Sequence, residues 1–400
     1  MYLWSSLPEK NIIMRTYTYL LICVMIAFYS CTNKSNSNLS HLTDIIITPS
    51  DIEPSFDIAN YISDDFDIIA LETNEECLIA GINDVIYINE KYYILDKQTS
   101  SIFVFDSQGK YISKLFKKGE GPDEYTSLDA FVVIGNDIWI SDTNIRVLIG
   151  YNSNFDLIKK INLWDKMTVN DLAVMDNYIC MASNWSGLYD NNIQLGLYGI
   201  HNEEMKGLIY VPEIPEYAAR FTKTSQLSMS GDSCLFIYSY CDSIFQIKHD
   251  SVIPQYRIAF KERYKDIPYS IEDYINPDKG EIIKGIEDIK QINNNILLGY
   301  IDNGIFISAV YNIDKNQSQS YSHLSHSGLG NMKIFQYATY INDDYILSTY
   351  ELTEVFNDKQ LSFIPDFNLI ENEEDKKKIE QVVSGLNMES NPILVKFKLK

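Results

Sequence analysis

The stretch DVIYINEKYYILDKQTSSIFVFDSQGKYISKLF, residues 84–116, decides the fold of this chain. It divides into four short runs rich in Tyr, Ile, Val and Phe, residue types that favour β-strands. The residues Asp106-Ser107-Gln108-Gly109-Lys110 separate the last two runs and have the composition of a tight turn. The stretch therefore predicts four antiparallel strands, at residues 84–89, 92–96, 102–106 and 111–116.

The same unit recurs along the chain at intervals of roughly 40–60 residues, which is typical of four-stranded propeller blades. Its second strand is the most apolar part. The six copies read YYILD at 92–96, IWISD at 138–142, YICMA at 178–182, CLFIY at 234–238, ILLGY at 296–300 and YILST at 345–349. A strand that is apolar on both faces must be covered on both faces, as between neighbouring blades. Six units predict a six-bladed β-propeller.

The sixth unit is one strand short. A polar segment follows Tyr350, in which Glu371–Leu386 predicts a surface helix, and residues 392–399 supply one last strand. A spare strand, FDIIALET at 66–73, precedes the first unit. We expect it to complete the last blade and close the ring, because closure removes open sheet edges. The expected fold is all-β: a six-bladed β-propeller of four-stranded blades over residues 61–400, with a short helical insertion at about 354–390.

The N-terminus has the pattern of an export signal. The apolar run Tyr17–Tyr29 follows Arg15 and is shorter than the roughly 20 residues that a membrane-spanning helix needs. It ends in Phe28-Tyr29-Ser30-Cys31, which resembles a bacterial lipobox with Phe where Leu is commoner. We expect residues 1–30 to be a signal peptide, which would work best from Met14, and residues 31–60 to be a lipidated Cys31 and a flexible tether. An ordinary cleaved signal is the alternative.

Composition narrows the functions that remain. Hydrophobic residues make up 46% of the 400 residues, and the net charge of −22 comes without a basic stripe, which argues against a nucleic-acid partner. The six cysteines show no C-x-x-C pair and no regular spacing, which argues against a zinc site and a disulfide scaffold. We expect Cys77, Cys180 and Cys234 to be buried small hydrophobes.

Residues 118–151, KGEGPDEYTSLDAFVVIGNDIWISDTNIRVLIGY, look like an NHL repeat. The likeness lies in the G-x-GP-x-EY turn at 119–125 and in the apolar strand that ends in Ser141-Asp142-Thr143-Asn144. From about residue 60 the chain resembles the six-bladed propeller lipoproteins common in Bacteroidota, which share the opening FDIIALET-x-x-ECLI, the YYILD strand and the lipidated leader. This resemblance is strong in the first two blades and faint in the last three, and it implies a fold and a location.

Candidate site residues come from three places. Glu120, Asp123 and Glu124 surround a turn that contains Gly and Pro, and they could line one mouth of the ring, whereas Tyr125 is expected to pack into the blade junction. Asp96 and Asp142 end two second strands and could point into the central channel.

Trp185, Tyr189 and the insertion Tyr264–Tyr274 carry aromatic rings that could bind a sugar or a protein, or could simply cover blade edges. His323 and His326 lie in the Ser-rich segment YSHLSHSG, which predicts a solvated loop.

No set of residues commits the chain to a reaction, since neither H-E-x-x-H nor G-x-S-x-G is present. We therefore expect a non-enzymatic, monomeric propeller that is held in the cell envelope by its lipid anchor and binds an envelope protein or a glycan. No cofactor is expected, although calcium or another divalent metal would fit the acidity. The alternative is a divalent-metal propeller hydrolase or lyase that acts in the central channel, which the NHL-like blade motivates.

Overall fold

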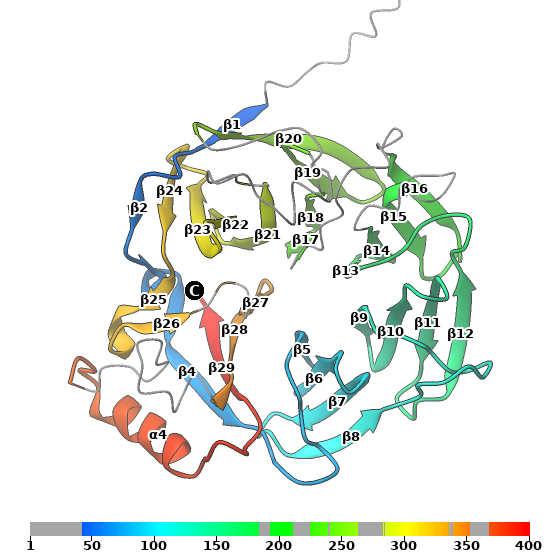
Figure 1. Cartoon of the computed structure of the whole chain (residues 1–400), viewed down its shortest axis with the longest axis horizontal. Coiled ribbons are helices and arrows are strands. Elements are labelled where there is room, and N and C mark those ends of the chain that lie inside the picture. The colour runs from blue at the N-terminus through cyan, green and yellow to red at the C-terminus, as the bar shows by residue number, and fades with distance from the viewer. Residues whose placement is uncertain are drawn as a thin grey trace, which may run out of the picture. The chain divides into compact units, whose positions relative to one another are not determined.

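The computed structural model describes residues 42–183, 193–210, 225–238, 241–262, 283, 285–334, 336, 339–352 and 368–400. Residues 43–400 form one compact unit. In this unit, sheets follow one another around a centre, and each of the larger sheets has one strand at the inside (Figure 1). The architecture is an all-β propeller.

The first three sheets have four antiparallel strands each, in sequence order from the inside outward. They comprise β5 (Asp84–Ile88), β6 (Lys91–Asp96), β7 (Ser101–Asp106) and β8 (Tyr111–Leu115); β9 (Ala130–Ile134), β10 (Asp137–Asp142), β11 (Val147–Tyr151) and β12 (Leu157–Asn162); and β13 (Asp171–Met175), β14 (Tyr178–Ala182), β15 (Ile193–Gly199) and β16 (Met205–Tyr210).

The next two sheets have five strands each, because a strand from the N-terminal segment is added at the outer edge. One consists of β17 (Leu227–Ser230), β18 (Ser233–Phe236), β19 (Ser243–Lys248), β20 (Ser251–Phe260) and β1 (Thr43–Ile47). The other consists of β21 (Ile286–Ile292), β22 (Asn295–Asp302), β23 (Ile305–Asn312), β24 (Gln317–Tyr321) and β2 (Ile52–Glu53).

The ring is closed by a strand from the other end of the chain. The last sheet has the order β27 (Thr339–Ile341), β28 (Tyr345–Tyr350), β29 (Ile393–Leu399) and β4 (Ile62–Ala70). The expected spare strand is β4, which begins earlier than predicted and pairs antiparallel with the C-terminal strand β29, Phe66 lying opposite Phe397. The expected helix in this region is α4 (Glu373–Ser384), capped by the Asn372 side chain.

The prediction of six four-stranded blades is wrong, because the described residues form seven sheets. The additional and smallest sheet has three short strands: β25 (Leu324–His326), β26 (Met332–Ile334) and β3 (Phe56–Asp57). It packs against the β21–β24 sheet, the last sheet and α4 in one shared core. Its β25 strand lies in the YSHLSHSG segment, so the prediction of a solvated loop there is also wrong. Strands of two or three residues are too short to show an alternating pattern.

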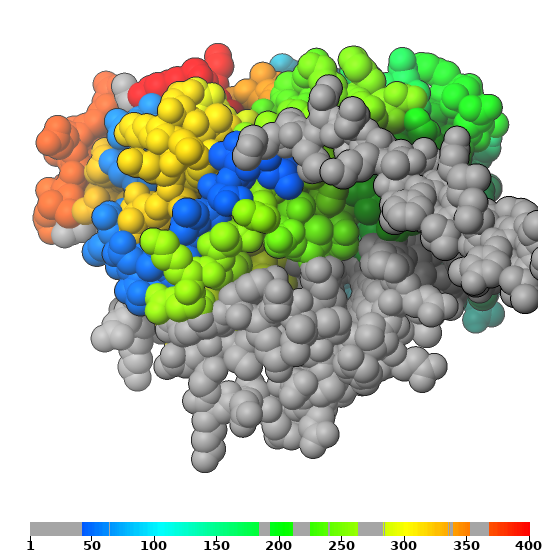
Figure 2. Space-filling model, turned by 90° about the horizontal axis from the view of Figure 1, so that it is seen from above, coloured from blue at the N-terminus to red at the C-terminus, as the bar shows by residue number. Residues whose placement is uncertain are grey.

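The segment from Thr43 to Asp57, which we call the belt, runs along the outside of three consecutive sheets. Its strands pair in parallel with β20, β24 and β25, with Thr43 opposite Tyr256, Ile52 opposite Ser320 and Phe56 opposite Leu324. Figure 2 shows the blue N-terminal strands lying against the green and yellow surfaces of these sheets. The turn η1 (Ile58–Asn60) then leads into β4. Sequence analysis had assigned these residues to the tether.

The strands form where apolar residues can be covered on both faces. All but the first residue of β6 and of β10 are buried, whereas β12 at an outer edge has no buried residue. The inner hairpins use two-residue turns with positive φ, as at Asn89 and Glu90. The turn at 106–110 is confirmed. Its Gly109 has φ +80°, and a Cβ there would lie 2.5 Å from the Ala70 carbonyl oxygen, so both the backbone conformation and the close approach favour glycine.

Cys77, Cys180 and Cys234 are buried and Cys241 is partly exposed, and these four described cysteines form no disulfide. The expectation that the first three act as small core residues is confirmed. Within the described ranges, no helix combines the length and the hydropathy needed to span a bilayer.

Candidate functional site in the central cavity

Six inner strands surround a cavity of about 350 Å³. These strands are β5, β9, β13, β17, β21 and β27, and each contacts the next around the ring. The polar groups that line the cavity include Asp84, Lys97, Asp171, Lys290, Tyr340 and Asn342. The three-stranded sheet contributes none of the lining residues. The centre of the propeller is therefore a polar cavity with ionisable side chains.

Three carboxylates occupy the same position in alternate sheets. Asp84, Asp171 and Asp288 each lie four residues before the end of the inner strand, where the hairpin turn begins. The two intervening sheets have Ala130 and Gln226 at this position. We call Asp84, Asp171, Gln226 and Asp288 the acceptor ring, since each carries at least one side-chain oxygen that can accept hydrogen bonds. Of the four, Asp84 and Asp171 line the cavity.

Asp84 begins β5 and lines the cavity. Its Oδ1 accepts the N–H of Val85 at 2.8 Å. The protein around the cavity desolvates this carboxyl group. This desolvation, followed by repulsion from Asp171, raises the pKa of Asp84 to about 7.

Asp171 begins β13 and is held by backbone donors. Its Oδ2 accepts the N–H groups of Gln226 at 2.7 Å and Leu227 at 3.0 Å, and its Oδ1 accepts that of Leu172 at 2.9 Å. Desolvation raises the pKa of Asp171 to about 6, and these backbone hydrogen bonds limit the rise. Asp171 thereby also fixes the start of the neighbouring strand β17.

Asp288 is completely buried and forms an ion pair with Lys290. The distance from Nζ to Oδ2 is 2.5 Å, and Gln336 Nε2 donates to the same oxygen at 3.0 Å. Asp288 Oδ1 is buried without a hydrogen-bond partner among the described residues. Lys290, one of two lysines that line the cavity, therefore already has its charge balanced by Asp288.

Gln226 is 1% exposed and uses both amide protons internally. Its Nε2 donates to the carbonyl oxygens of Ser183 at 3.1 Å and Ile237 at 3.2 Å. Its Oε1 is buried and has no partner in the described part of the chain. Among the described residues, Gln226 Oε1 and Asp288 Oδ1 are thus two buried acceptors without a donor.

The two acids singled out in the sequence, Asp96 and Asp142, hold their own loops. Asp96 accepts the N–H groups of Ala80, Gln98 and Thr99. Asp142 is 1% exposed and receives donors from residues 126, 127, 144 and 145. Burial alone would raise the pKa of Asp142, but these backbone hydrogen bonds lower it. Neither residue lines the central cavity.

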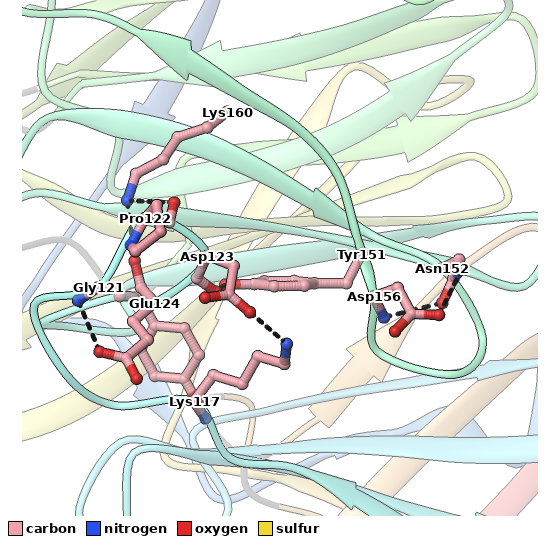
Figure 3. A network of polar contacts seen from close by, with 10 residues as sticks. Lys117, Gly121, Pro122, Asp123, Glu124, Tyr151, Asn152, Asp156 and Lys160 are labelled. Carbon is pink, nitrogen blue, oxygen red and sulfur yellow. Dashed lines mark hydrogen bonds and ion pairs between the residues drawn. The ribbon is translucent and has the colours of Figure 1, made fainter.

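Figure 3 shows the polar contacts of the turn at residues 118–125, which lies between β8 and β9 in sequence and contributes no residue to the cavity lining. Asp123 pairs with Lys117 at 2.8 Å, and the Glu124 carboxylate accepts the Gly121 N–H at 2.6 Å. Tyr125 is fully buried in the core between the first and second sheets, as expected, and its hydroxyl donates to the Ser100 carbonyl. Glu120 is exposed. A binding role for these four residues, as for Asp96 and Asp142, stays a prediction.

Cys31, Trp185, Tyr189 and the insertion at 264–274 lie outside the described residues. Sequence reasoning missed the acceptor ring. The available signal was an acid at the start of a first strand, in Asn83-Asp84, Asn170-Asp171 and Glu287-Asp288. In the described ranges, no three His, Cys, Asp or Glu side chains come together closely enough to hold a metal ion.

A family model described as "Domain of unknown function (DUF4934)" matches residues 45–398. The chain belongs to this family. The match begins in the belt and ends in β29, so the family covers the whole propeller. A comparison with the curated proteins finds no match.

The family's fold is also found in solved structures. A crystal structure of a proposed exported protein from Bacteroides fragilis superposes with a TM-score of 0.64 at 15% identity, covering 90% of this chain and 100% of that chain. A member of the duf4221 family from Bacteroides vulgatus gives a TM-score of 0.47 at 13% identity, covering 85% and 97%. Virginiamycin B lyase from Staphylococcus aureus gives 0.39 at 12% identity, covering 71% and 94%, which is too low to bear on the activity of this chain.

Proposed function

We propose that this protein is an exported, lipid-anchored binding propeller of the bacterial cell envelope, and that its central cavity holds a small ligand. The apolar run Tyr17–Tyr29 and the following Cys31 support export and lipid attachment. The Bacteroides fragilis protein of similar fold is itself described as a proposed exported protein, which agrees with this location.

The cavity is the observation that carries the binding proposal. Its volume of about 350 Å³ lies within the range of small-molecule sites, about 300–1,000 Å³. Desolvated Asp84 and Asp171 raise the free energy of the empty site, because their charged forms lack adequate solvation. Clefts that contain carboxyls with perturbed pKa values are typical of functional sites.

Binding without chemistry is the function that these residues support best. Asp96 and Asp142 are engaged by backbone N–H groups, and the described part of the chain offers no three-ligand metal group. No observation favours the hydrolase or lyase, so that alternative is not carried further. The ring presents a preformed cavity on rigid strands, as a receptor for a small molecule would.

Lipid attachment is tested in cells of a Bacteroidota host by labelling with a radioactive fatty acid. The wild-type chain should carry the label and sediment with membranes, whereas Cys31→Ala should do neither. Wild-type protein that is unlabelled and soluble would leave only the ordinary cleaved signal.

The cavity is tested by thermal unfolding of residues 32–400 against a metabolite panel that contains cations, anions and neutral sugars. A ligand at 100 times its dissociation constant adds about 2.7 kcal/mol to the free energy of unfolding. Val174→Trp would fill the cavity, which Val174 lines, and should abolish any shift. Ile158→Trp, on the exposed face of β12, is the matched control and should preserve it. Equal shifts in both variants would place binding elsewhere.

A further inference from the structure

We infer that the ligand of the central cavity is a small organic cation, bound through an ammonium or guanidinium group by the carboxylates of Asp84 and Asp171. This inference rests on the proposed binding function and adds the chemical class of the ligand. Its basis is the balance of donors, acceptors and charges at one level of the ring.

The hydrogen bonds of the cavity lining favour a ligand that carries donors. Asp84 and Asp171 both line the cavity. Among the described residues, Asp84 accepts the Val85 N–H at 2.8 Å, and Asp171 accepts three backbone N–H groups. A carboxylate has about four lone-pair sites, so a group with several N–H donors would stabilise Asp84 in particular.

The charge balance calls for a cation. Lys290 is matched by Asp288, whereas no ion pair forms between Asp84 or Asp171 and a described cation. Exposed Lys97 lowers the pKa of both carboxyls but only partly offsets their desolvation. Among the lining residues, the carboxyls of Asp84, Asp129 and Asp171 outnumber the two lysines, and Lys290 is already paired with Asp288, so the lining favours a cation over an anion.

The shape of the cavity favours an organic cation over a metal ion. No three carboxylate, histidine or cysteine groups converge within the described ranges. The walls between the polar positions are apolar and include Ile86, Val132 and Leu172. A cavity of about 350 Å³ with such walls accommodates a carbon chain that carries the charged group at one end.

Proton linkage provides a distinctive readout. The ionisable groups facing Asp84 are Asp171, Lys97, Lys290, Tyr340 and Tyr345, and those facing Asp171 are Asp84, Lys97 and Cys234. Because Asp84 and Asp171 have pKa values of about 7 and about 6, each is partly protonated in that range. A cation binds their charged forms, so its affinity should rise with pH and its binding should release protons.

The test is calorimetric titration of residues 32–400 with butylamine and agmatine, with butyrate and succinate, and with glucose. We expect the cations alone to bind, about tenfold more tightly at pH 8 than at pH 5.5. Proton release should appear at pH 6.5 in buffers of different ionisation enthalpy. Asp84→Asn and Asp171→Asn should each weaken binding at least about tenfold. Glu389→Gln, which removes an exposed carboxylate, is the control.

The outcomes of this titration distinguish an error in the cation inference from an error in the cavity proposal. If butyrate, succinate or glucose binds and Val174→Trp abolishes that binding, the cavity is a ligand site but the cation inference is wrong. If agmatine binds to Val174→Trp and to the Asn variants as tightly as to wild type, it binds outside the cavity. The cavity proposal and the cation inference are then both wrong. No binding by any of the five probes, with unchanged folding of all variants, also overturns the cation inference, and the metabolite panel then decides the cavity proposal.

Discussion

Asp84, Asp171 and Asp288 share one position in alternate sheets but have three different environments. Asp288 is neutralised by Lys290, Asp171 is held by three backbone N–H groups, and Asp84 accepts one N–H group among the described residues. The pKa of Asp84 therefore rises further than that of Asp171, to about 7 against about 6. The residue with the fewest hydrogen bonds has the greatest capacity to gain from a ligand.

Asp84→Asn should stabilise the fold in a manner that depends on pH. The unfolded chain ionises Asp84 near pH 4, whereas the folded chain ionises it near pH 7. Wild-type stability attributable to this group is therefore retained below about pH 4 and lost as the pH rises to 7. We expect Asp84→Asn to add about 1–3 kcal/mol at pH 8 and little at pH 4. Urea unfolding at pH 8 and at pH 4 measures the difference in stability between the variant and wild type. An equal difference at the two pH values would contradict the prediction.

Asp142→Ala should lower the stability of the fold, in contrast to Asp84→Asn. It would leave several buried N–H groups without an acceptor and should cost about 2–4 kcal/mol at pH 7. Since the pKa of Asp142 is lowered, the difference from wild type should shrink as the pH falls below about 4. Asp156→Ala, in an exposed turn, is the comparison. Denaturant midpoints across this pH range provide the measurement.

The candidate site was not predictable because the sequence does not show which strand of each hairpin lines the cavity. Asp96 and Asp142 were the conspicuous acids, since each ends a strongly apolar second strand. Asp84 lies at the same end of its hairpin, opposite Leu95, but on the inner strand, as Asp171 does in its sheet. The inner strand lines the cavity, whereas the end of the second strand holds its own loop.

At the scale of elements, the belt determines how the outer edges of three sheets are covered. Ile45 and Ile47 of β1 are buried in the core of the β17–β20 and β21–β24 sheets, whereas Ile46 between them is 47% exposed. The belt thus contributes side chains to the core as well as backbone hydrogen bonds. Its strands cover sheet edges that would otherwise be open to another chain.

Neighbouring residues of β1 provide a matched pair for mutation. Ile45→Ala should cost about 2–4 kcal/mol, because it leaves a cavity in the core. Ile46→Ala should change stability by less than about 0.5 kcal/mol. Chemical denaturation of both variants measures the difference. Similar costs would mean that β1 does not pack in solution as it does here.

At the scale of the whole molecule, closure through β4 and β29 was predictable because a missing strand at one end matched a spare strand at the other. The number of sheets was not predictable. The small three-stranded sheet combines residues 56–57 with residues 324–334, and none of its strands is long enough to be predicted from the sequence. Periodicity identifies strands of five or six residues, whereas shorter strands depend on neighbours that are distant in sequence.

Removal of β29 tests whether the propeller ring needs this strand to close. A chain ending at Pro392 lacks the strand between β28 and β4 and should lose cooperative unfolding or aggregate. A chain lacking only Lys400 is the control and should unfold like wild type. Scanning calorimetry and light scattering distinguish the outcomes. A single wild-type transition in the Pro392 variant would show that the ring does not need this strand.

The belt also has a consequence for how the chain reaches its native state. Its partners lie about two hundred or more residues downstream, with Thr43 beside Tyr256 and Phe56 beside Leu324, and β4 pairs with the last strand. Contacts so distant in sequence form late and slowly. In an exported chain, the N-terminal strands would emerge first and have no partners until the C-terminus followed. The topology itself would thus delay folding until translocation was complete.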